Sequence, residues 1–472
     1  MSLNDELGRL SPITDPLTRA FAERGHSLYL VGGPVRDAIM GIPSSDLDFT
    51  TSARPDVIES ILRGLGGPIW DMGRDFGTIG TILADGDHEW QVEVTTFRAD
   101  SYLPDSRKPQ VRFGEKIEDD LKRRDFTINA MAVDLVNGTF VDPFRGEVDL
   151  AEGVIRTPTT PEISFSDDPL RMMRAARFAA RFGFRPEPEV IRAMLGMAER
   201  LSIVSEERIR DEFSKLLLTD TPRVGVDILV RTGLADVFLP ELPALRLEID
   251  EHHHHKDVYE HSLTVLNQAI ALEKARNHAP DIVNRLAALL HDIGKPRTRR
   301  FEPGGKVSFI GHDHVGAKMA AKRLTAMKYP KDVVESVAKL IDLHLRFHGY
   351  GEGEWSDSAV RRYVRDAGPE LERLHILTRS DCTTRNKNKA ETLRRAYDEL
   401  EWRIDELAAQ EELDSIRPDL DGNQIMEILG IGPSRTVGEA YSYLLERRLD
   451  RGPVDPETAK AELLTWWESR HS

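Results

Sequence analysis

The segment that decides the fold is VGGPVRD (31–37), followed closely by SDLDFTT (45–51). An apolar run, SLYLV (27–31), leads into the two glycines as a buried strand leads into a tight turn. Glycines between a strand and a helix let the backbone approach a phosphate, and the helix N-terminus favours an anion. Pro34 suits the first turn of that helix. The pattern therefore predicts a strand–turn–helix that binds a phosphate group.

Two carboxylates follow this turn. Asp46 and Asp48 are two residues apart, so on a strand both side chains project from the same face. Carboxylates held so close repel each other unless a divalent cation lies between them, and Mg²⁺ prefers one or two carboxylates with water and phosphate oxygens. An Asp-x-Asp pair alone is common in solvated turns; the glycine turn before it favours a metal site for phosphoryl transfer. Arg36 is a candidate phosphate ligand, the alternative being a surface pair with Asp37.

The composition is that of a multidomain globular protein. The chain has 472 residues, of which 40% are hydrophobic and 31% charged, which suggests about three or four folding units. With 64 basic and 80 acidic residues the net charge is −16, so nucleic acid would bind only through a local basic stripe, by selective docking. Cys382 is the single cysteine, which excludes an intramolecular disulfide. We find no secretory signal and no membrane-spanning run, and expect a cytoplasmic protein without membrane contact.

Secondary-structure patterns divide the chain. Strand-like and helix-like runs alternate in the first 150 residues, whereas helical spacing dominates from about residue 165 onwards. We therefore expect an α+β multidomain protein, with a small mixed α/β head followed by an elongated all-α body. The expected parts are the head (1–150), a helical neck (151–245), a histidine-rich domain (246–382) and a C-terminal helical region (383–472).

Three further motifs follow in order: EDDLKRRDFTINA (118–130), DPF (142–144) and DDPLRMMRAARF (167–178). Together with the glycine turn and the carboxylate pair, they resemble the class II nucleotidyltransferases over roughly residues 27–240. This family comprises tRNA CCA-adding enzymes and bacterial poly(A) polymerases, within the polymerase β-like superfamily. The resemblance implies a polymerase β-like head that uses Mg²⁺, bound by Asp46 and Asp48 as the catalytic residues, to extend RNA 3′ ends without a template.

The third motif is where the family reads the incoming base. The resemblance assigns Asp168 and Arg171 to its Watson–Crick edge. Asp168 would accept from the amino group of cytosine or adenine, and the pair would reject the carbonyl of uracil or guanine, because a buried polar group would then lack a partner. The motif thus implies CTP and ATP as substrates. The resemblance also assigns base reading and RNA binding to the neck (151–245) and tRNA binding to the C-terminal region (383–472).

Arginines recur along this motif with helical spacing. Arg171, Arg174 and Arg177 are three residues apart and Arg181 follows, so they form one basic stripe. From composition alone, such a stripe is as often a solvated face as an RNA-binding one. The resemblance implies that Arg174 and Arg177 meet the triphosphate or stack near the base. It also implies that nucleotide phosphates contact Gly33, Arg36 and Arg124.

Glu93 lies on the polar face of an alternating run, WQVEVTTF (90–97). A third catalytic carboxylate and an edge-strand glutamate paired with a lysine or arginine are equally good interpretations. We therefore leave Glu93 outside the predicted metal set.

A second constellation lies in the histidine-rich segment, around LLHDIGK (289–295) and GHDHVGA (311–317). A lone histidine is usually a core residue, but ordered imidazoles and carboxylates over about 120 residues favour a divalent metal site. The candidate ligands are His261, His291, Asp292, His312, His344 and Asp381. The segment resembles the HD domain of metal-dependent phosphohydrolases, and a role as a structural module stays open. The run at 252–255 is interpreted as solvated.

The leading hypothesis is a template-independent tRNA nucleotidyltransferase that adds CCA from CTP and ATP, with tRNA as partner. A poly(A) polymerase, or an enzyme that adds only CC or only A, shares these motifs and remains an alternative. From another class, the chain could be an HD-type phosphohydrolase with an accessory head, or a noncatalytic tRNA-binding protein. The intact carboxylate pair argues against both. The oligomeric state is not predicted.

Overall fold

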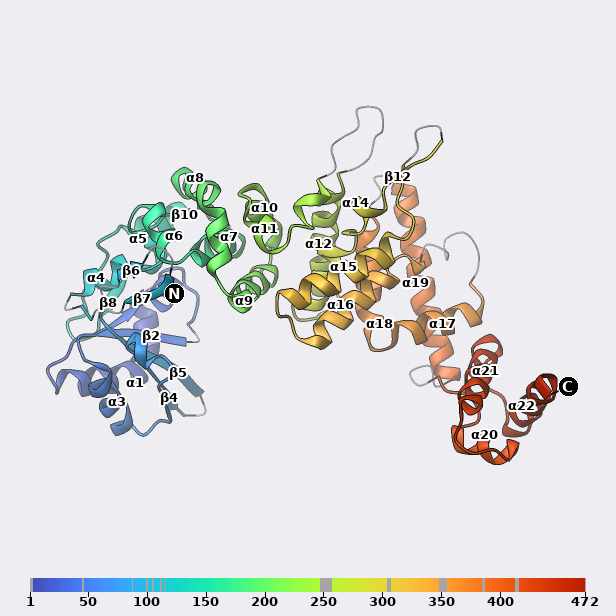
Figure 1. The fold of residues 1–472 in the computed structure, drawn as a ribbon. Helices are drawn as coiled ribbons and strands as arrows, with labels where there is room; N and C mark the ends of the chain where they lie inside the picture. The colour runs from blue at the N-terminus through green and yellow to red at the C-terminus, as the bar shows by residue number, and fades with distance from the viewer. Residues whose placement is uncertain are drawn as a thin grey trace. The chain divides into compact units, whose positions relative to one another are not determined.

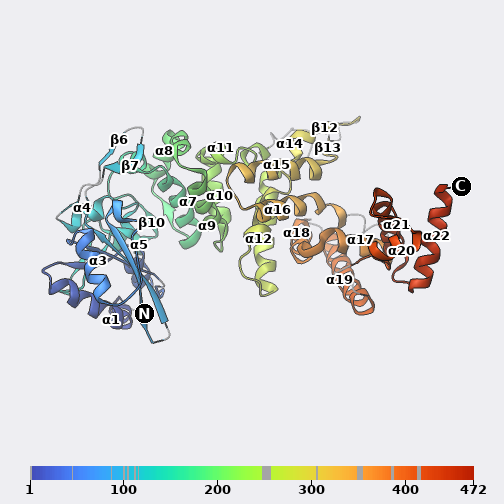
Figure 2. The same cartoon turned by 60° about the horizontal axis from the view of Figure 1, so that its bottom comes forward.

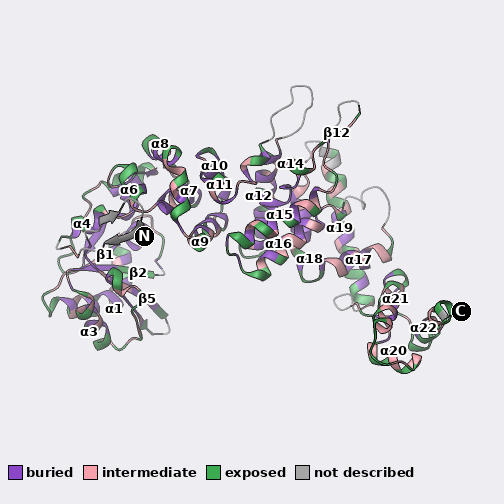
Figure 3. Ribbon diagram, viewed as in Figure 1, coloured by how far each residue is buried: buried purple, intermediate pink, exposed green. Residues whose placement is uncertain are grey.

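The computed structural model describes residues 3–44, 46–86, 88–98, 101–103, 106–110, 113–114, 116–246, 257–303, 307–347, 355–383, 387–411 and 416–471. The chain divides into two compact units, Met1–Pro243 and Ala244–Ser472 (Figure 1). Each unit has its own buried interior (Figure 3). The run at 252–255 lies outside the described residues.

The first unit begins with a seven-stranded mixed sheet of order β3-β4-β5-β2-β1-β8-β9. Its strands are β1 (Leu28–Val31), β2 (Asp46–Thr51), β3 (Ile69–Trp70), β4 (Thr78–Asp85), β5 (His88–Thr96), β8 (Ala132–Asp134) and β9 (Phe140–Val141). Only the β2–β5 pair is parallel; the other pairings in this sheet are antiparallel. A separate hairpin joins β6 (Ser101–Leu103) to β7 (Ser106–Gln110). The parallel pair matters because it aligns the carboxylates of two strands.

Helices pack around this sheet (Figures 1 and 2). They are α1 (Leu3–Ala22), α2 (Gly33–Ile39), α3 (Pro55–Gly64) and α4 (Ile117–Lys122). Val31, Phe97 and Leu121 belong to one buried apolar cluster under the sheet. Burial of such side chains contributes about 1.5–3 kcal/mol each, so this cluster fixes α4 and its motif against the strand that leads into the glycine turn.

The rest of the first unit is helical and is built around α7 (Leu170–Phe182). Its other main helices are α5 (Gly146–Glu152), α6 (Pro161–Asp167), α8 (Pro188–Met197), α9 (Glu206–Leu217), α10 (Pro222–Arg231) and α11 (Leu234–Phe238). Helix α10 approaches α7 so closely that a Cβ at Gly225 would lie 2.6 Å from the carbonyl oxygen of Ala176. Only glycine permits this contact, and α7 is consequently buried along most of its length.

The second unit is almost entirely helical. Its larger part contains α12 (Val258–Ala275), α13 (Ile282–Leu290), α14 (Lys295–Thr298), α15 (His312–Ala326), α16 (Lys331–Leu343), α17 (Asp357–Ala367), α18 (Leu371–Asp381), α19 (Lys387–Gln410) and a hairpin of β12 (Arg300–Phe301) and β13 (Val307–Ser308). The C-terminal helices α20 (Gly422–Leu429), α21 (Arg435–Arg451) and α22 (Pro456–His471) enclose a separate apolar cluster that includes Ile425, Leu444 and Leu463.

Candidate functional site

The carboxylate pair lies on β2, where the burial pattern alternates. Asp46 and Asp48 are exposed while the side chains of Leu47 and Phe49 are buried, so both carboxylates project from the accessible face. In the parallel pairing with β5, Asp48 lies opposite Glu93. Three carboxylates therefore share one face of the sheet, an arrangement that could hold a divalent cation.

The structure decides between the two interpretations of Glu93 in one respect. Strand β5 lies inside the sheet, between β4 and β2, so the edge-strand alternative is wrong. Within the described part of the chain, Glu93 forms no ion pair with a lysine or arginine. Periodicity could place Glu93 on a polar face, but it could not show which strand would lie next to it.

The environment opposes charge on these carboxylates. Burial raises the pKa of Asp48, and Asp46 raises it further, whereas the guanidinium of Arg124 acts in the opposite direction. Burial and the charge of Asp48 likewise raise the pKa of Glu93. Asp48 remains reachable by solvent although protein surrounds it. A bound divalent cation would relieve this mutual repulsion, because it favours the charged form of each carboxylate.

The glycine turn lies against the guanidinium of Arg124, whose positive charge also acts on Asp48. Gly32 has φ +75°, and a Cβ there would lie 2.7 Å from Nη1 of Arg124. The position therefore requires glycine both for its backbone conformation and for the close approach of Arg124. Nη2 of Arg124 lies 3.3 Å from Oδ2 of Asp120, and its buried Nε has no hydrogen-bond partner among the described residues. Arg124 thus lies against the turn and acts electrostatically on Asp48.

Arg36 is held inside the protein. Its Nε donates to Asp37 at 2.8 Å, and its Nη1 donates to the side-chain oxygen of Asn129 at 2.6 Å. The guanidinium also faces the rings of Phe178 and Phe182, at 5.5 and 4.8 Å. The pair with Asp37 exists, but Arg36 is buried, so the surface-pair alternative is wrong. Its Nη2 lies 3.7 Å from the Cβ position of Gly33, which keeps the phosphate role as a prediction.

The arginines of α7 do not form a solvated face. Arg171 is buried and donates to the Ser164 hydroxyl at 2.9 Å and to the Arg123 carbonyl at 2.6 Å. Arg177 is also buried and pairs with Glu212 of α9. The solvated alternative fails because α9 and α10 pack against α7. Arg181 is the member that stays largely exposed, with 44% of its side chain accessible.

Arg174, in the motif 167–178, forms an ion pair with Asp125, in the motif 118–130. It donates from Nε to Asp125 at 2.7 Å. Burial alone would raise the pKa of Asp125, but Arg174 and a hydrogen bond from Asn129 hold it well below its ordinary value. Asp125 is therefore a charged, buried anchor. Asp125 and Asn129 belong to the motif 118–130, but their spacing does not indicate which arginines they contact.

Asp168 and Arg171, predicted to act together on one base, have different partners. Asp168 accepts from Arg208 of α9 at 2.8 Å and from the backbone N–H of Leu170 at 3.1 Å. Arg208 was missed by sequence reasoning, since it lies 40 residues from Asp168 with no local signal. The base-reading role of the pair stays a prediction.

In the second unit, the six predicted metal ligands come together. They form two adjacent groups, His261, His291 and Asp381 in one and Asp292, His312 and His344 in the other, with the ligand atoms of each group within 4.8 Å of one another. Nε2 of His261 lies 3.2 Å from Nε2 of His291 and 2.9 Å from Oδ1 of Asp381. Nε2 of His312 lies 3.3 Å from Oδ1 of Asp292. These are the donor atoms and spacings of a divalent metal centre.

The hydrogen bonds of the imidazoles support this interpretation. Nδ1 of each histidine faces an oxygen: the carbonyl of Ala288 for His291, of Phe309 for His312 and of Ile341 for His344, and the hydroxyl of Thr383 for His261. A donor at Nδ1 leaves the lone pair on Nε2, the atom that points to the other ligands. Nε2 of His344 is buried without a partner among the described residues.

Two neighbours complete the description of this centre. Lys295 was not predicted, and its Nζ lies 2.6 Å from Oδ2 of Asp292. His314, which shares the motif of His312, is exposed and pairs with Asp342 instead. It is therefore not among the clustered ligands.

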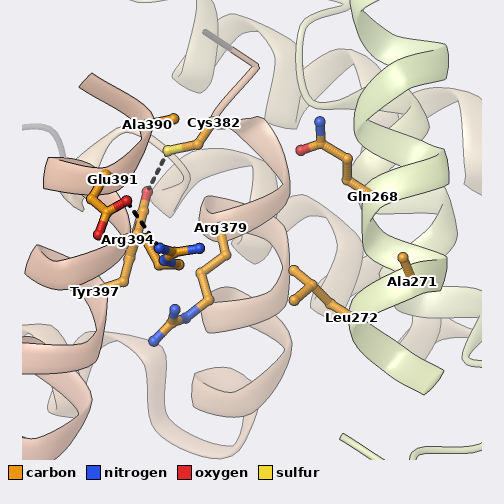
Figure 4. A pocket seen from close by; sticks show the side chains of 9 residues that line it. All are labelled: Gln268, Ala271, Leu272, Arg379, Cys382, Ala390, Glu391, Arg394 and Tyr397. Carbon is orange, nitrogen blue, oxygen red and sulfur yellow. Dashed lines mark hydrogen bonds and ion pairs between the residues drawn. The ribbon is translucent and has the colours of Figure 1, made fainter. Parts of the chain in front are cut away.

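A cavity of about 580 Å³ lies between α12, α18 and α19 (Figure 4). Its lining includes Gln268 and Leu272 from α12 and Arg394 from α19. Cys382, which directly follows the candidate ligand Asp381, also lines it. One residue of the cavity wall is therefore adjacent along the chain to the cluster of candidate metal ligands.

Comparisons with known proteins agree with this architecture. The chain matches the Poly A polymerase head domain over residues 28–156, the probable RNA- and SrmB-binding site of polymerase A over 183–245, and the HD domain over 258–386. These matches define the class, a multidomain nucleotidyltransferase with an HD domain. None of the described helices is long and apolar enough to cross a membrane.

Relatives of similar sequence identify the family within this class. The chain is 33% identical to an A-adding tRNA nucleotidyltransferase of Deinococcus radiodurans over 93% of its length, covering 95% of that protein. It is 31% identical to a CC-adding tRNA nucleotidyltransferase of Thermus thermophilus over 94% of each chain. A CCA-adding enzyme of Bacillus subtilis is 41% identical over 48% of this chain and 54% of that protein. The chain therefore belongs to the tRNA nucleotidyltransferase family, whose members are metal-dependent enzymes.

Solved structures confirm the predicted fold class. A CCA-adding enzyme of Bacillus stearothermophilus in complex with CTP has a TM-score of 0.67 and 24% identity, with 96% of each chain covered. A CCA-adding enzyme of Thermotoga maritima complexed with tRNA has a TM-score of 0.62 and 20% identity, with 99% of each covered. At these identities the likeness shows the fold alone.

Proposed function

We propose that this protein adds nucleotides of the CCA sequence to tRNA 3′ ends, from CTP and ATP, in the cytoplasm. The observation that carries the proposal is the register of β2 and β5, which lines up Asp46, Asp48 and Glu93 on one accessible face. The glycine turn and Arg124 lie beside this face. Full-length relatives that are tRNA nucleotidyltransferases support the same reaction and substrate.

In this proposal, Asp46 and Asp48 hold Mg²⁺, and Glu93 contributes the third carboxylate. Bound Mg²⁺ would activate the tRNA 3′ hydroxyl and stabilise the charge that develops on the triphosphate. Gly33 and Arg124 would bind phosphate oxygens, because a backbone near a helix N-terminus and a guanidinium both favour anions. Arg36 would assist from its position beside Gly33.

Asp168 and Arg171 would read the incoming base. Each already has a partner in the protein, Arg208 for Asp168 and Ser164 for Arg171, so each side chain is held in place before a nucleotide binds. A preorganised pair discriminates strongly, because a base of the wrong kind leaves its polar atoms unpaired. Arg174 and Arg177 would support this site from α7.

In the proposed domain division, the head would end near residue 150, the neck near 245 and the HD domain near 382.

Stepwise addition tests the proposal. Purified protein with Mg²⁺ is incubated with tRNAs that lack three, two or one terminal nucleotides, each with a single labelled nucleotide. We expect two cytidine additions followed by one adenosine, each at least about a hundredfold slower with Asp48→Asn. Open-ended adenosine addition to arbitrary RNA would reject the tRNA proposal.

A second candidate is partial addition. Two relatives that match nearly the whole chain are an A-adding and a CC-adding enzyme, whereas the CCA-adding enzyme of Bacillus subtilis matches about half of it. The same assay separates these cases. A CC-adding enzyme would stop after two cytidines, and an A-adding enzyme would extend only tRNA that already ends in CC.

The clustered histidines favour an additional activity, metal-dependent hydrolysis of a phosphoester by the HD domain. Six convergent ligands carry this candidate. Metal analysis and phosphodiesterase assays of wild type against Asp292→Ala test it, with Asp48→Asn as the matched variant that leaves this centre intact. Absence of both metal and hydrolysis in the wild type would reduce the domain to a scaffold.

A further inference from the structure

An ion pair on α1, formed by the buried Glu6 and the more exposed Arg9, lies against the chain just before β2. The Glu6 side chain is fully buried, and its carboxylate accepts from Nε of Arg9 at 2.8 Å and from the backbone N–H of Ser44 at 3.0 Å. Nη2 of Arg9 donates to the carbonyl oxygen of Ser44 at 3.0 Å. One ion pair therefore takes both backbone hydrogen-bonding groups of Ser44, two residues before Asp46.

The same arginine contacts the neighbouring strand. Cζ of Arg9 lies 4.9 Å from the ring centroid of Trp90 on β5, at a cation–π distance. Trp90 is buried and directly precedes Gln91, which is the register partner of Asp46. The ion pair thus touches both strands that bring carboxylates to the site.

Helix α1 is fixed well enough to act as a support. Its apolar face, which includes Leu10, Leu17 and Phe21, is buried, and α1 packs against α2, β1 and β4. Arg9 and the Ser44 N–H hold the pKa of Glu6 below its ordinary value, so the carboxylate is charged at neutral pH. The helix precedes the residues matched by the head-domain model, which begin at 28.

We propose that Glu6 and Arg9 are positioning residues, which set the position of Asp46 and Asp48 relative to Glu93 and thereby the affinity of the site for its divalent cation. The inference rests on the proposed role of these carboxylates as metal ligands. A displacement of about 1 Å in reacting groups costs on the order of a hundredfold in rate, so a backbone contact two residues away is close enough to matter.

The test measures cytidine or adenosine addition by the full chain as a function of Mg²⁺ concentration. For Glu6→Ala we expect kcat to fall about tenfold, a higher Mg²⁺ concentration at half-maximal rate, and an unchanged KM for tRNA. Glu6→Gln keeps an acceptor for the Ser44 N–H and should retain most of the wild-type rate. If Glu6→Ala does not fold, Arg9→Met serves instead, since it keeps the apolar stem over Trp90 but loses the donors to Ser44.

Leu17→Ala is the matched control, because it weakens the packing of α1 without touching Ser44. It should lower the melting temperature and leave the Mg²⁺ dependence unchanged. Hydrogen exchange should become faster in the peptide 42–48 for Glu6→Ala but not for Leu17→Ala. Wild-type Mg²⁺ dependence in Glu6→Ala, or an equal shift in Leu17→Ala, would overturn the inference. A wild type that adds no nucleotide would reject the proposed function instead, and the exchange comparison would still decide whether Glu6 holds Ser44.

Discussion

Glu93 on β5 lies opposite Asp48 on β2 in the parallel pair of strands, and the charge of Asp48 helps to raise the pKa of Glu93. Two ionised carboxylates so close together repel each other, and the sheet offers Glu93 no ion pair with a described lysine or arginine. A divalent cation bound between them would make this juxtaposition favourable.

Replacing either carboxylate should therefore weaken metal-dependent transfer. We expect Asp48→Asn to lower kcat at least about a hundredfold, because metal stabilisation of the transition state is worth several kcal/mol. Glu93→Gln should have a smaller effect, about tenfold, together with a higher Mg²⁺ requirement. Asp85→Asn, at the exposed end of β4, is the control and should behave like wild type. An unchanged Mg²⁺ curve for Glu93→Gln would remove Glu93 from the metal set.

The HD centre predicts a metal content that depends on specific histidines. Asp292→Ala and His344→Ala should lose bound divalent metal, because each removes a buried ligand atom of the cluster. His314→Ala should retain it, since His314 is exposed and pairs with Asp342. Elemental analysis of each purified variant measures the metal content. Equal loss in His314→Ala would contradict the ligand assignment.

Metal binding at this centre should also depend on pH. Burial alone would lower the pKa of His291, but Asp292 and Asp381 raise it to about 10. The metal-free protein therefore carries a proton on His291 at neutral pH, and metal must displace it from the imidazole. Affinity should rise about tenfold per pH unit for one released proton, up to about pH 10, as measured by competition with a chelator. A pH-independent affinity between pH 6.5 and 8.5 would contradict this assignment.

Base selection should fail when Asp168 is removed. Asp168→Ala should lower kcat/KM for CTP and ATP about a hundredfold or more, and lower the preference over UTP and GTP, because the amino group loses its acceptor. Arg208→Ala is the informative comparison, since it removes the protein partner of Asp168 but leaves the carboxylate. A variant of Asp168 that still selects CTP and ATP would show that another group reads the base.

Local motifs made part of this site predictable. His291, Asp292 and His312, like Asp46 and Asp48, stand in short segments whose residue types indicate metal binding. The other three candidate HD ligands were predicted only from the ordered series of imidazoles and carboxylates, and the structure brings all six together. Packing partners had no such signal. Arg36 meets Asn129 across 93 residues of sequence, and Arg177 meets Glu212 across 35. Helical spacing predicted that the arginines of α7 are neighbours, but not that Arg171 would be buried against Ser164 of α6 and Arg177 against Glu212 of α9.

Substitutions in the ion pair of Arg177 and Glu212 test whether the burial of Arg177 serves stability or catalysis. Both side chains are at most 10% exposed, so Glu212→Gln should leave a buried guanidinium without its counter-charge and destabilise this unit by about 3 kcal/mol. Hydrogen exchange in α7 and α9 measures this effect locally, and Glu189→Gln in the exposed pair with Arg192 should leave exchange unchanged.

Substitution of both partners by apolar residues distinguishes the two roles. Arg177→Met with Glu212→Leu should recover stability, because a well-packed apolar pair can replace a buried ion pair. If nucleotide addition recovers with it, Arg177 serves to hold α7 against α9. If stability recovers while addition stays at least about tenfold lower, Arg177 also acts on the nucleotide, as the resemblance to the nucleotidyltransferases implies.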